Sequence, residues 1–384
     1  MSEWKKVKLG DLYEVHNGLS KGRQFFGTGF PFLTFSNVFN NWFLPEELES
    51  LVQTTDKERE ACSIKAGDVF ITRTSETMDE LGMSSVALKD YPNATYNGFT
   101  KRLRPITNRV NPRYIGYYLR TPKFRGQFMA FSTMTTRASL ANNDLLNMEV
   151  ELPSMEIQHR IATILSRYDS LIENYQKQIK LLEEAAQRLY KEWFIDLHFP
   201  RHENTNIIDG VPEGWEKKKV GDITPIITGK KDANFGTPDG EYPFFTCSQE
   251  PIKAPSFSFD CAAVLLAGNG DFNVKLYRGR FEAYQRTYVL SPYIDSHLYL
   301  LFYTISANMT KLAAGSSGST IKFLTKGMID GINLNVPNDE ILRSFNKKVE
   351  PIQSSRESLQ SQLRLLTEAR DRLLPKLMSG EITI

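Results

Sequence analysis

The chain has 384 residues, of which 41% are hydrophobic and 24% are charged, values typical of a globular protein rather than a disordered one. It contains no uninterrupted apolar stretch of the roughly 18 to 20 residues that a membrane span requires, and its first residues lack the apolar run of a signal peptide. We therefore expect a cytoplasmic protein without membrane contact. Its three cysteines are expected to be free thiols, because an odd, scattered set does not suit a disulfide framework.

The net charge of +2 conceals two basic segments. Residues 89–140 contain ten Lys or Arg against the single acid Asp90, and residues 275–326 contain seven against Glu282 and Asp295. One such segment is often only a solvated surface. Two of them at matching places in a repeat favour a polyanionic partner.

The repeat begins at the start of the chain. Trp4 and the Gly10-Asp11 pair recur 211 residues later, at Trp215 and Gly221-Asp222. Near the end of each half, Pro153 and Pro337 are 184 residues apart. The second globular part is therefore shorter by about 27 residues, the difference between these two separations, and the chain is expected to form two related domains.

Each globular part combines strand and helix patterns. Residues 68–73 and 261–267 are apolar runs bounded by glycine, which predicts buried strands. Residues 113–120 and 297–304 are predicted to form short helices. The fold class is thus α/β or α+β, and the pattern leaves the strand order open.

Each half ends in a long amphipathic helix. Apolar residues recur at steps of three and four from Ile157 to Leu189 and from Ile341 to Leu373, the pattern of a coiled-coil seam. Ser154 and Asn338, which follow prolines, are candidate N-caps. We expect the two helices to pair antiparallel and give the chain a pseudo-twofold repeat. The expected boundaries are 1–153 for the first globular domain, 154–199 for the first long helix, 200–337 for the second domain and 338–384 for the second helix.

The clearest match lies within these helices, where Leu181–Leu189 and Leu365–Leu373 agree at six of nine positions. Together with the Trp and Gly-Asp opening of each half, this order of domain, helix, domain, helix resembles the specificity subunits of Type I restriction enzymes over essentially the whole chain. The resemblance implies two target-recognition domains that read the halves of an asymmetric, bipartite double-stranded DNA target. It also implies helices that form an antiparallel coiled coil, set the gap between the half-sites and dock partner subunits.

The resemblance further implies the partners. Two methyltransferase (M) subunits would bind the chain, and restriction (R) subunits would join through the complex, in a bacterial or archaeal cytoplasm. AdoMet, ATP and Mg²⁺ would be bound by those partners, so no cofactor is expected in this chain. The open alternatives are a methylase-only or Type IIB-like system, a stand-alone DNA-modifying enzyme, and a protein-binding scaffold.

Candidate DNA contacts combine basic and amide side chains with small hydroxyl residues, because phosphate contacts supply affinity while Arg, Asn and Gln read base edges. In the first domain they are Thr72, Arg73, Thr74, Ser75, Lys101, Arg102, Arg104, Thr135, Thr136, Arg137 and Ser139. In the second domain they are Asn269, Asn273, Lys275, Arg278, Arg280, Gln285, Arg286, Ser316, Ser317, Ser319 and Lys322.

Candidate partner-binding residues are the matched helix positions, and the resemblance implies this role. They are Leu182, Glu184, Ala185, Arg188, Leu189, Leu366, Glu368, Ala369, Arg372 and Leu373. No metal site is predicted, because His198 and His202 have a zinc-like spacing without paired cysteines. The chain also contains neither a Gly-x-x-x-x-Gly-Lys-Ser/Thr phosphate loop nor the Asn-Pro-Pro-Phe type of tetrapeptide found in amino-methyltransferases, so no catalytic residue is predicted.

Overall fold

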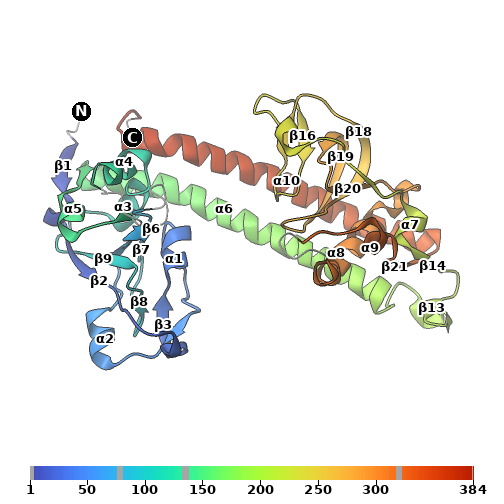
Figure 1. Cartoon of the computed structure of the whole chain (residues 1–384), viewed down its shortest axis with the longest axis horizontal. Coiled ribbons are helices and arrows are strands. Elements are labelled where there is room, and N and C mark those ends of the chain that lie inside the picture. The colour runs from blue at the N-terminus through green and yellow to red at the C-terminus, as the bar shows by residue number, and fades with distance from the viewer. Residues whose placement is uncertain (1–3, 76–80, 132–137, 317–321, 383) are drawn as a thin grey trace. The chain divides into compact units, whose positions relative to one another are not determined.

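The structure is a computed structural model that describes residues 4–75, 81–131, 138–316, 322–382 and 384. The chain divides into two compact units, the first comprising Met1–Asn174 and Gln362–Ile384, the second Tyr175–Ser361. Each unit therefore contains one globular domain and one end of each long helix. Those helices are α6 (Met155–Tyr190) and α10 (Asp339–Met378), both unbroken (Figure 1). Among the described residues, no helix is long and apolar enough to cross a membrane.

Unit 1 is built on two sheets whose strand pairs are mostly antiparallel. A four-stranded sheet has the order β2-β9-β5-β7, and a three-stranded sheet has the order β4-β3-β8, in which β3 and β8 are parallel. Two short ladders, β1-β11 and β6-β10, complete the strands. The strands are β1 (Lys5–Lys8), β2 (Tyr13–Asn17), β3 (Phe26–Leu33), β4 (Leu51–Val52), β5 (Val69–Thr72), β6 (Thr74–Ser75), β7 (Ser84–Val86), β8 (Thr95–Tyr96), β9 (Thr100–Pro105), β10 (Ala138–Ser139) and β11 (Glu149–Leu152).

Short helices complete unit 1. They are α1 (Phe35–Asn40), α2 (Asp56–Ala61), α3 (Pro112–Tyr118), α4 (Pro122–Phe131) and α5 (Asn142–Asn147). The predicted helix at 113–120 is α3, which begins where Asn111 caps two backbone N–H groups and Pro112 takes the first helical position. Two α3 tyrosines tie the helix to its surroundings, since Tyr114 donates to the Glu151 carbonyl (2.7 Å) and Tyr117 to Asp169 of α6 (2.5 Å).

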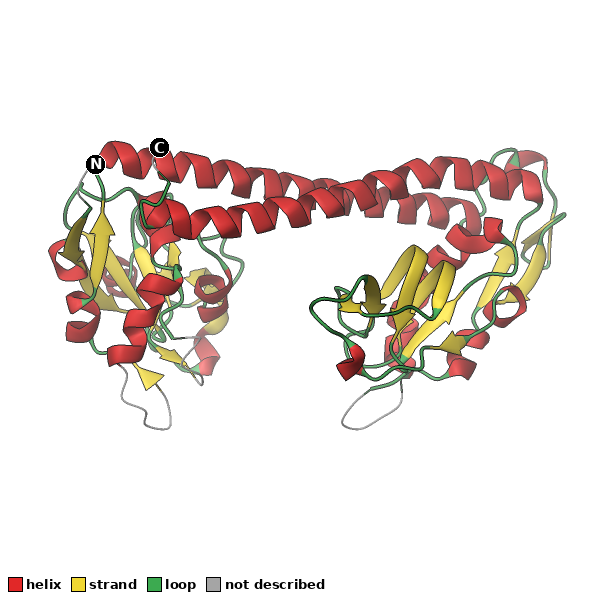
Figure 2. Ribbon diagram, turned by 90° about the horizontal axis from the view of Figure 1, so that it is seen from above, coloured by secondary structure: helices red, strands yellow, loops and turns green. Residues whose placement is uncertain are grey.

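Unit 2 contains a six-stranded sheet of order β15-β20-β18-β19-β16-β17, with helices beside it (Figure 2). Two ladders, β12-β13 and β14-β21, lie outside this sheet. The strands are β12 (Ile207–Ile208), β13 (Val211–Pro212), β14 (Glu216–Lys219), β15 (Ile227–Thr228), β16 (Tyr242–Phe245), β17 (Ile252–Ala254), β18 (Phe259–Ala267), β19 (Val274–Ala283), β20 (Thr287–Leu290) and β21 (Asn333–Val336). The helices are α7 (Val220–Ile223), α8 (Leu298–Gly315) and α9 (Lys326–Asp330).

The mixed fold class and the two predicted strands are confirmed, because residues 69–72 form β5 and residues 259–267 form β18. The predicted helix at 297–304 is too short. Helix α8 continues to Gly315, since its buried face extends through Ile305 to Leu312. The predicted caps of the long helices are also present, since Ser154 Oγ accepts from the Ile157 N–H (3.4 Å) and Asn338 Oδ1 from the Ile341 N–H (3.0 Å).

The long helices pack antiparallel within each unit. In unit 1 the beginning of α6 meets the end of α10, where Arg370 donates to Asp169 at 3.0 Å. In unit 2 the end of α6 meets the beginning of α10, where Arg356 and Glu183 form an ion pair at 3.4 Å. Each end of a helix is therefore held by the opposite end of its partner.

An aromatic cluster joins both helices to the core of unit 2. Helix α6 continues as a π-helical turn over Lys191–Ile195, which places Trp193 and Phe194 against Phe345 of α10. Phe345 is fully buried and also contacts Tyr303 of α8 edge-on. Such aromatic pairs stabilise a core beyond the area that they bury.

We predict that Phe345→Ala destabilises unit 2 by about 3–5 kcal/mol, because it leaves a cavity among three aromatic rings. Leu365→Ala is the matched control on the same helix, and since Leu365 is 58% exposed its effect should stay within about 0.5 kcal/mol. Urea unfolding followed by tryptophan fluorescence measures both. Equal midpoints for the two variants would contradict this assignment of the core.

Candidate nucleic-acid interface

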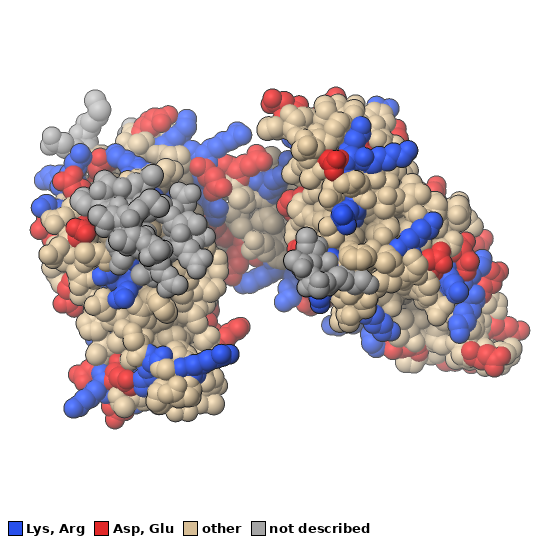
Figure 3. Space-filling model, viewed as in Figure 1, with Lys and Arg blue, Asp and Glu red and all other residues tan. Residues whose placement is uncertain are grey.

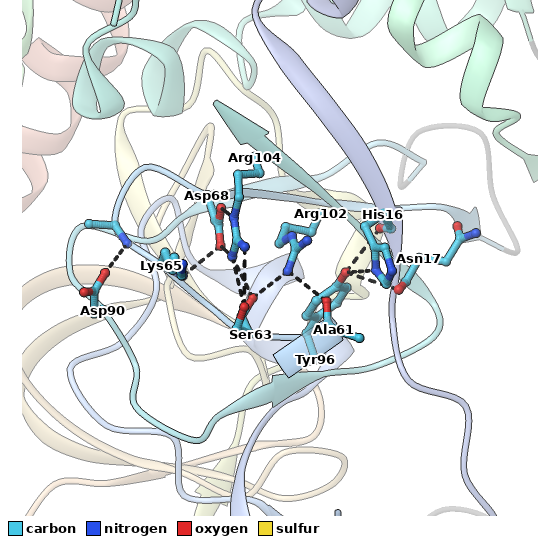
Figure 4. Close-up of polar contacts among 11 residues, drawn as sticks. His16, Asn17, Ala61, Ser63, Lys65, Asp68, Asp90, Tyr96, Arg102 and Arg104 are labelled. Carbon is cyan, nitrogen blue, oxygen red and sulfur yellow. Dashed lines mark hydrogen bonds and ion pairs between the residues drawn. The ribbon is translucent and has the colours of Figure 1, made fainter. Parts of the chain in front are cut away.

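Several arginines of the first basic segment are part of the internal structure (Figure 4). Arg104 donates from Nε and Nη2 to the fully buried Asp68, at 2.8 and 2.7 Å, and also to the Ser63 carbonyl. The hydrogen bond with Asp68 holds the pKa of Arg104 above its ordinary value. This ion pair joins β9 to the turn that precedes β5.

Arg102 has a similar role. Its guanidinium donates to the carbonyls of Ala61 (3.2 Å) and Ser63 (2.7 Å) and lies over the Tyr96 ring at 5.6 Å. Arg120 donates to four backbone carbonyls, and burial lowers its pKa to about 10. Thr72 is fully buried, and its hydroxyl accepts from the Met83 N–H. Thr72, Arg102 and Arg104 therefore all have partners inside the domain.

Lys101 and Arg73 lie together at one end of the β5-β9 pair. Lys101 is 4% exposed and donates to Asn142 at the start of α5. Burial, and then the nearby charge of Arg73, lower the pKa of Lys101. Arg73 is partly buried, and its Nε has no hydrogen-bond partner among the described residues. Arg102 Nε is also buried without a partner among the described residues, so this feature does not by itself mark a ligand contact.

Five of the candidate residues lie outside the described residues, namely Thr135, Thr136, Arg137, Ser317 and Ser319. Thr74, Ser75 and Ser139 are placed by their backbone, in the β6-β10 ladder that pairs Thr74 with Ser139 and Ser75 with Ala138. This ladder follows directly after Arg73, so the structure brings two of the predicted segments of the first domain together.

In the second domain a polar network surrounds the turn after β18. Asn273 donates to the carbonyls of Cys247 (3.0 Å) and Asp271 (2.7 Å) and accepts from Lys275. The Cys247 thiol donates to Asn269 Oδ1 at 2.8 Å. Lys275 donates further to the Ser248 carbonyl, and burial lowers its pKa. These hydrogen bonds link the groups to one another and so hold the turn in one conformation.

Three further candidates also have internal contacts. Arg280 pairs with Asp260 at 3.1 Å on the surface, and Arg278 lies over the Tyr299 ring at 5.3 Å. Ser316 donates to the Ala313 carbonyl at 2.6 Å and ends α8. On the face drawn in Figure 3, Lys and Arg are interspersed with Asp and Glu over the described residues, so the basic segments do not make one continuous patch there.

The remaining candidates gather at a pocket of about 330 Å³. We call its lining residues the second rim, and they are Thr228, Gly268, Gln285, Arg286, Tyr288, Phe323 and Leu324. Arg286 is exposed and its side chain has no partner among the described residues, whereas Gln285 donates to Asp232 at 2.5 Å. Lys322 is exposed next to Phe323. Sequence reasoning missed Thr228, Tyr288 and Phe323, which have no charge to signal them.

The matched helix positions share one pattern of exposure. Glu184, Ala185 and Arg188 are exposed on α6, and Leu182 and Leu189 are partly buried. The equivalent residues of α10 follow the same pattern, with Glu368, Ala369 and Arg372 exposed and Leu366 and Leu373 partly buried. Leu181 and Leu365, which begin the two motifs, are 63% and 58% exposed. The repeat therefore preserves a surface as well as a core contact.

A metal centre finds no support in the described part of the chain, where no group of three His, Cys, Asp or Glu could hold an ion. The rings of His198 and His202 are 5.2 Å apart, but His202 Nδ1 is hydrogen-bonded to the Phe199 carbonyl. These histidines thus close the turn after α6.

Comparisons with known proteins agree with this layout. A family model described as the Type I restriction modification DNA specificity domain matches residues 1–184 and 212–355. The EcoDI Type I specificity subunit of Escherichia coli is 36% identical over 177 residues, which are 45% of this chain and 40% of that protein's length. The MjaIX specificity subunit of Methanocaldococcus jannaschii is 26% identical over 416 residues, which cover 100% of this chain and 94% of that protein.

A solved structure extends the comparison to the fold. The Type-I restriction-modification S subunit from M. genitalium superposes with a TM-score of 0.66, at 15% identity, over 98% of this chain and 96% of that one. At this identity the likeness concerns the fold, which is shared over both halves of the chain.

We predict that Arg104→Ala destabilises unit 1 by about 3 kcal/mol, because it leaves the buried Asp68 carboxylate uncompensated. Arg109→Ala is the control, since Arg109 belongs to the same basic segment but is exposed and should change stability by less than about 0.5 kcal/mol. Thermal unfolding measures both. A double variant, Asp68→Ala with Arg104→Ala, should lose less than the sum of the single losses; strict additivity would contradict the pairing.

Proposed function

Because this chain belongs to the Type I restriction modification DNA specificity family, we propose that its two globular domains each read one half of an asymmetric, bipartite DNA target. The observation that carries this is the repeat of domain and helix in two units. Two related domains with different side chains at their surfaces would recognise two different short sequences. A duplex presents successive major-groove faces about 34 Å apart, so two such domains suit two sites with an unread gap.

We propose that α6 and α10 set the length of that gap. Both helices are continuous, with 36 and 40 residues, and the ion pairs from Arg370 and Arg356 hold them antiparallel in each unit. A paired helix resists bending far better than a loop, which makes it suitable as a spacer.

The helices also suit protein partners. Leu181, Glu184, Ala185 and Arg188 follow steps of three and four and so lie on one face of α6. The face of α10 that begins at Leu365 carries the same residues at the same spacing. We call these two faces the repeated stripe. Two copies of one surface favour two copies of one partner, and the family membership supports the proposal that this partner is the methyltransferase subunit.

The rest of the complex follows from this assignment. Restriction subunits would join through the methyltransferase subunits, and AdoMet, ATP and Mg²⁺ would be bound by those partners rather than by this chain. The relatives come from bacteria and archaea, whose DNA lies in the cytoplasm, and we propose that the complex acts there.

The main test is co-expression with a methyltransferase subunit encoded beside this chain, followed by single-molecule mapping of methylated bases in host DNA. A split motif with a fixed gap is expected. Adding four residues to both helices, after Asn174 and after Ser361, should lengthen the gap by about two base pairs, since four residues add about 6 Å of helix and base pairs stack about 3.4 Å apart.

The control adds the same four residues to the β12-β13 turn, between Asp209 and Gly210, and should leave the gap unchanged. A continuous motif, or methylation confined to one half-site, would contradict the bipartite assignment. An unchanged gap in the lengthened variant would contradict the role of the helices as spacer.

We further predict that Arg188→Glu together with Arg372→Glu abolishes co-purification of the methyltransferase subunit while the chain stays folded, because both side chains are exposed. Each single variant should retain one of the two copies, which mass photometry of the complex measures. Arg167→Glu with Lys348→Glu is the matched control, since these exposed residues lie on the same helices outside the stripe. Loss of both copies in a single variant would reject the repeated stripe.

A further inference from the structure

The two domains hold one short turn in the same hydrogen-bond frame. In unit 1 the Thr100 N–H donates to the Asn97 carbonyl (3.2 Å), and in unit 2 the Thr287 N–H donates to the Tyr284 carbonyl (2.8 Å). The residue before each threonine also accepts a hydrogen bond through its carbonyl oxygen. Phe99 accepts from the Arg73 N–H (3.0 Å), and Arg286 accepts from the Gly268 N–H (2.8 Å). Phe99 and Arg286 are therefore structurally equivalent.

The frame extends beyond the turn. The Leu140 N–H donates to the Arg73 carbonyl, and the Leu324 N–H donates to the Gly268 carbonyl, at 3.1 and 2.8 Å. In the sheet below, Asn17 pairs with Lys101 as Thr228 pairs with Tyr288. The β6-β10 pairing of Thr74 with Ser139 is matched by a bridge between Asn269 and Phe323. These pairings give each residue of the second rim a partner position in unit 1.

Two glycines show how closely the frame is built. A Cβ atom at Gly18 would lie 2.0 Å from the Asn97 carbonyl oxygen, and one at Gly229 would lie 1.9 Å from the Ala283 carbonyl oxygen. Both approaches are far shorter than van der Waals contact, so only glycine fits beside the turn. Gly18 and Gly229 are 211 residues apart, the same separation as Trp4 and Trp215.

We call the equivalent positions of unit 1 the first rim. In the order that matches Thr228, Gly268, Gln285, Arg286, Tyr288, Phe323 and Leu324 of the second rim, they are Asn17, Arg73, Gly98, Phe99, Lys101, Ser139 and Leu140. Only the last position keeps its residue type, and it is buried in both units, as Leu140 (4% exposed) and Leu324 (3% exposed). At the other six positions the residue types differ. A conserved backbone with variable side chains is the arrangement that a surface needs to read two different sequences.

At the turn the difference is one of chemistry. Arg286 is exposed and has no side-chain partner in the described part of the chain. Phe99, at the same place, is 58% exposed, so its apolar ring is accessible to a ligand. Arginine donates two hydrogen bonds to O6 and N7 of guanine, whereas an apolar ring contacts the thymine methyl group in the major groove.

We propose that this turn position determines specificity in both domains, with Arg286 reading a guanine of one half-site and Phe99 contacting a thymine methyl of the other. The proposal rests on the proposed function, because it assumes that each domain reads DNA. The two rims also differ in the position that holds an arginine. Arg73 stands beside Phe99 in unit 1, whereas its equivalent beside Arg286 is Gly268, so each rim presents an arginine from a different strand end.

The test is the methylation motif of the intact complex with Arg286→Phe and, separately, Phe99→Arg. Arg286→Phe should reduce the preference for guanine at one position by about tenfold or more. Phe99→Arg should shift one position of the other half-site from thymine towards guanine. Because the two changes must fall in different half-sites, the unchanged half-site in each variant reports that the complex is folded and active.

Two further variants separate base reading from other effects. Arg343→Phe is the matched control, an exposed arginine of the same unit that is already paired with Asp339 and is not a candidate DNA contact, and it should leave the motif unchanged. Arg286→Lys keeps the charge but loses the paired donors, so it should also weaken the guanine preference. If Arg286 contacts only phosphate, Arg286→Phe will lower occupancy at all sites without altering the motif, and the proposal is overturned.

The outcomes also separate this inference from the proposed function. A wild-type complex without a split motif refutes the proposed function. A wild-type split motif that persists unchanged in both Arg286→Phe and Phe99→Arg refutes only the assignment of the turn.

Discussion

The apolar stripe of the two long helices is the constraint on which the rest of the structure depends, since a helix of this length is stable in water only if its stripe is covered. In unit 1, Ile161 and Leu165 of α6 are buried with Leu374 and Leu377 of α10. In unit 2, Tyr190 of α6 is buried with Phe345 and Val349 of α10. Each domain core thus includes both helices, and the antiparallel pairing follows from the need to cover both ends.

Several arginines also hold the domain together from inside. A folded domain has few strong donors that can reach several carbonyls at once, and Arg102, Arg104 and Arg120 serve in this way. Their charges raise the local basic count, although their guanidinium groups are held by the protein itself. The number of basic residues along a sequence therefore overstates how many basic side chains are available to a ligand. Those that remain available, such as Arg286, are recognised by their lack of a protein partner in the described structure.

The two rims illustrate how a repeat can keep one backbone arrangement while its side chains change. Backbone hydrogen bonds and the glycines at 18 and 229 hold the turn, so its side chains carry little of the folding free energy and are free to differ. Phe99 and Arg286 are the clearest case. By contrast, the stripe on the helices keeps its side chains in both copies, as expected for a surface that meets the same partner twice.

Local patterns in the sequence were sufficient to determine the repeat, the two long helices with their caps at Ser154 and Asn338, and the buried strands β5 and β18. These features depend on residues within a few positions of one another or on a match between the halves. Only the tertiary structure decided which basic residues are available, because the partner of Arg104 is 36 residues away at Asp68 and the second rim draws on four separate segments. Strand order and the equivalence of Phe99 with Arg286 were likewise invisible to the sequence, since the residue types differ and only long-range backbone pairing relates them.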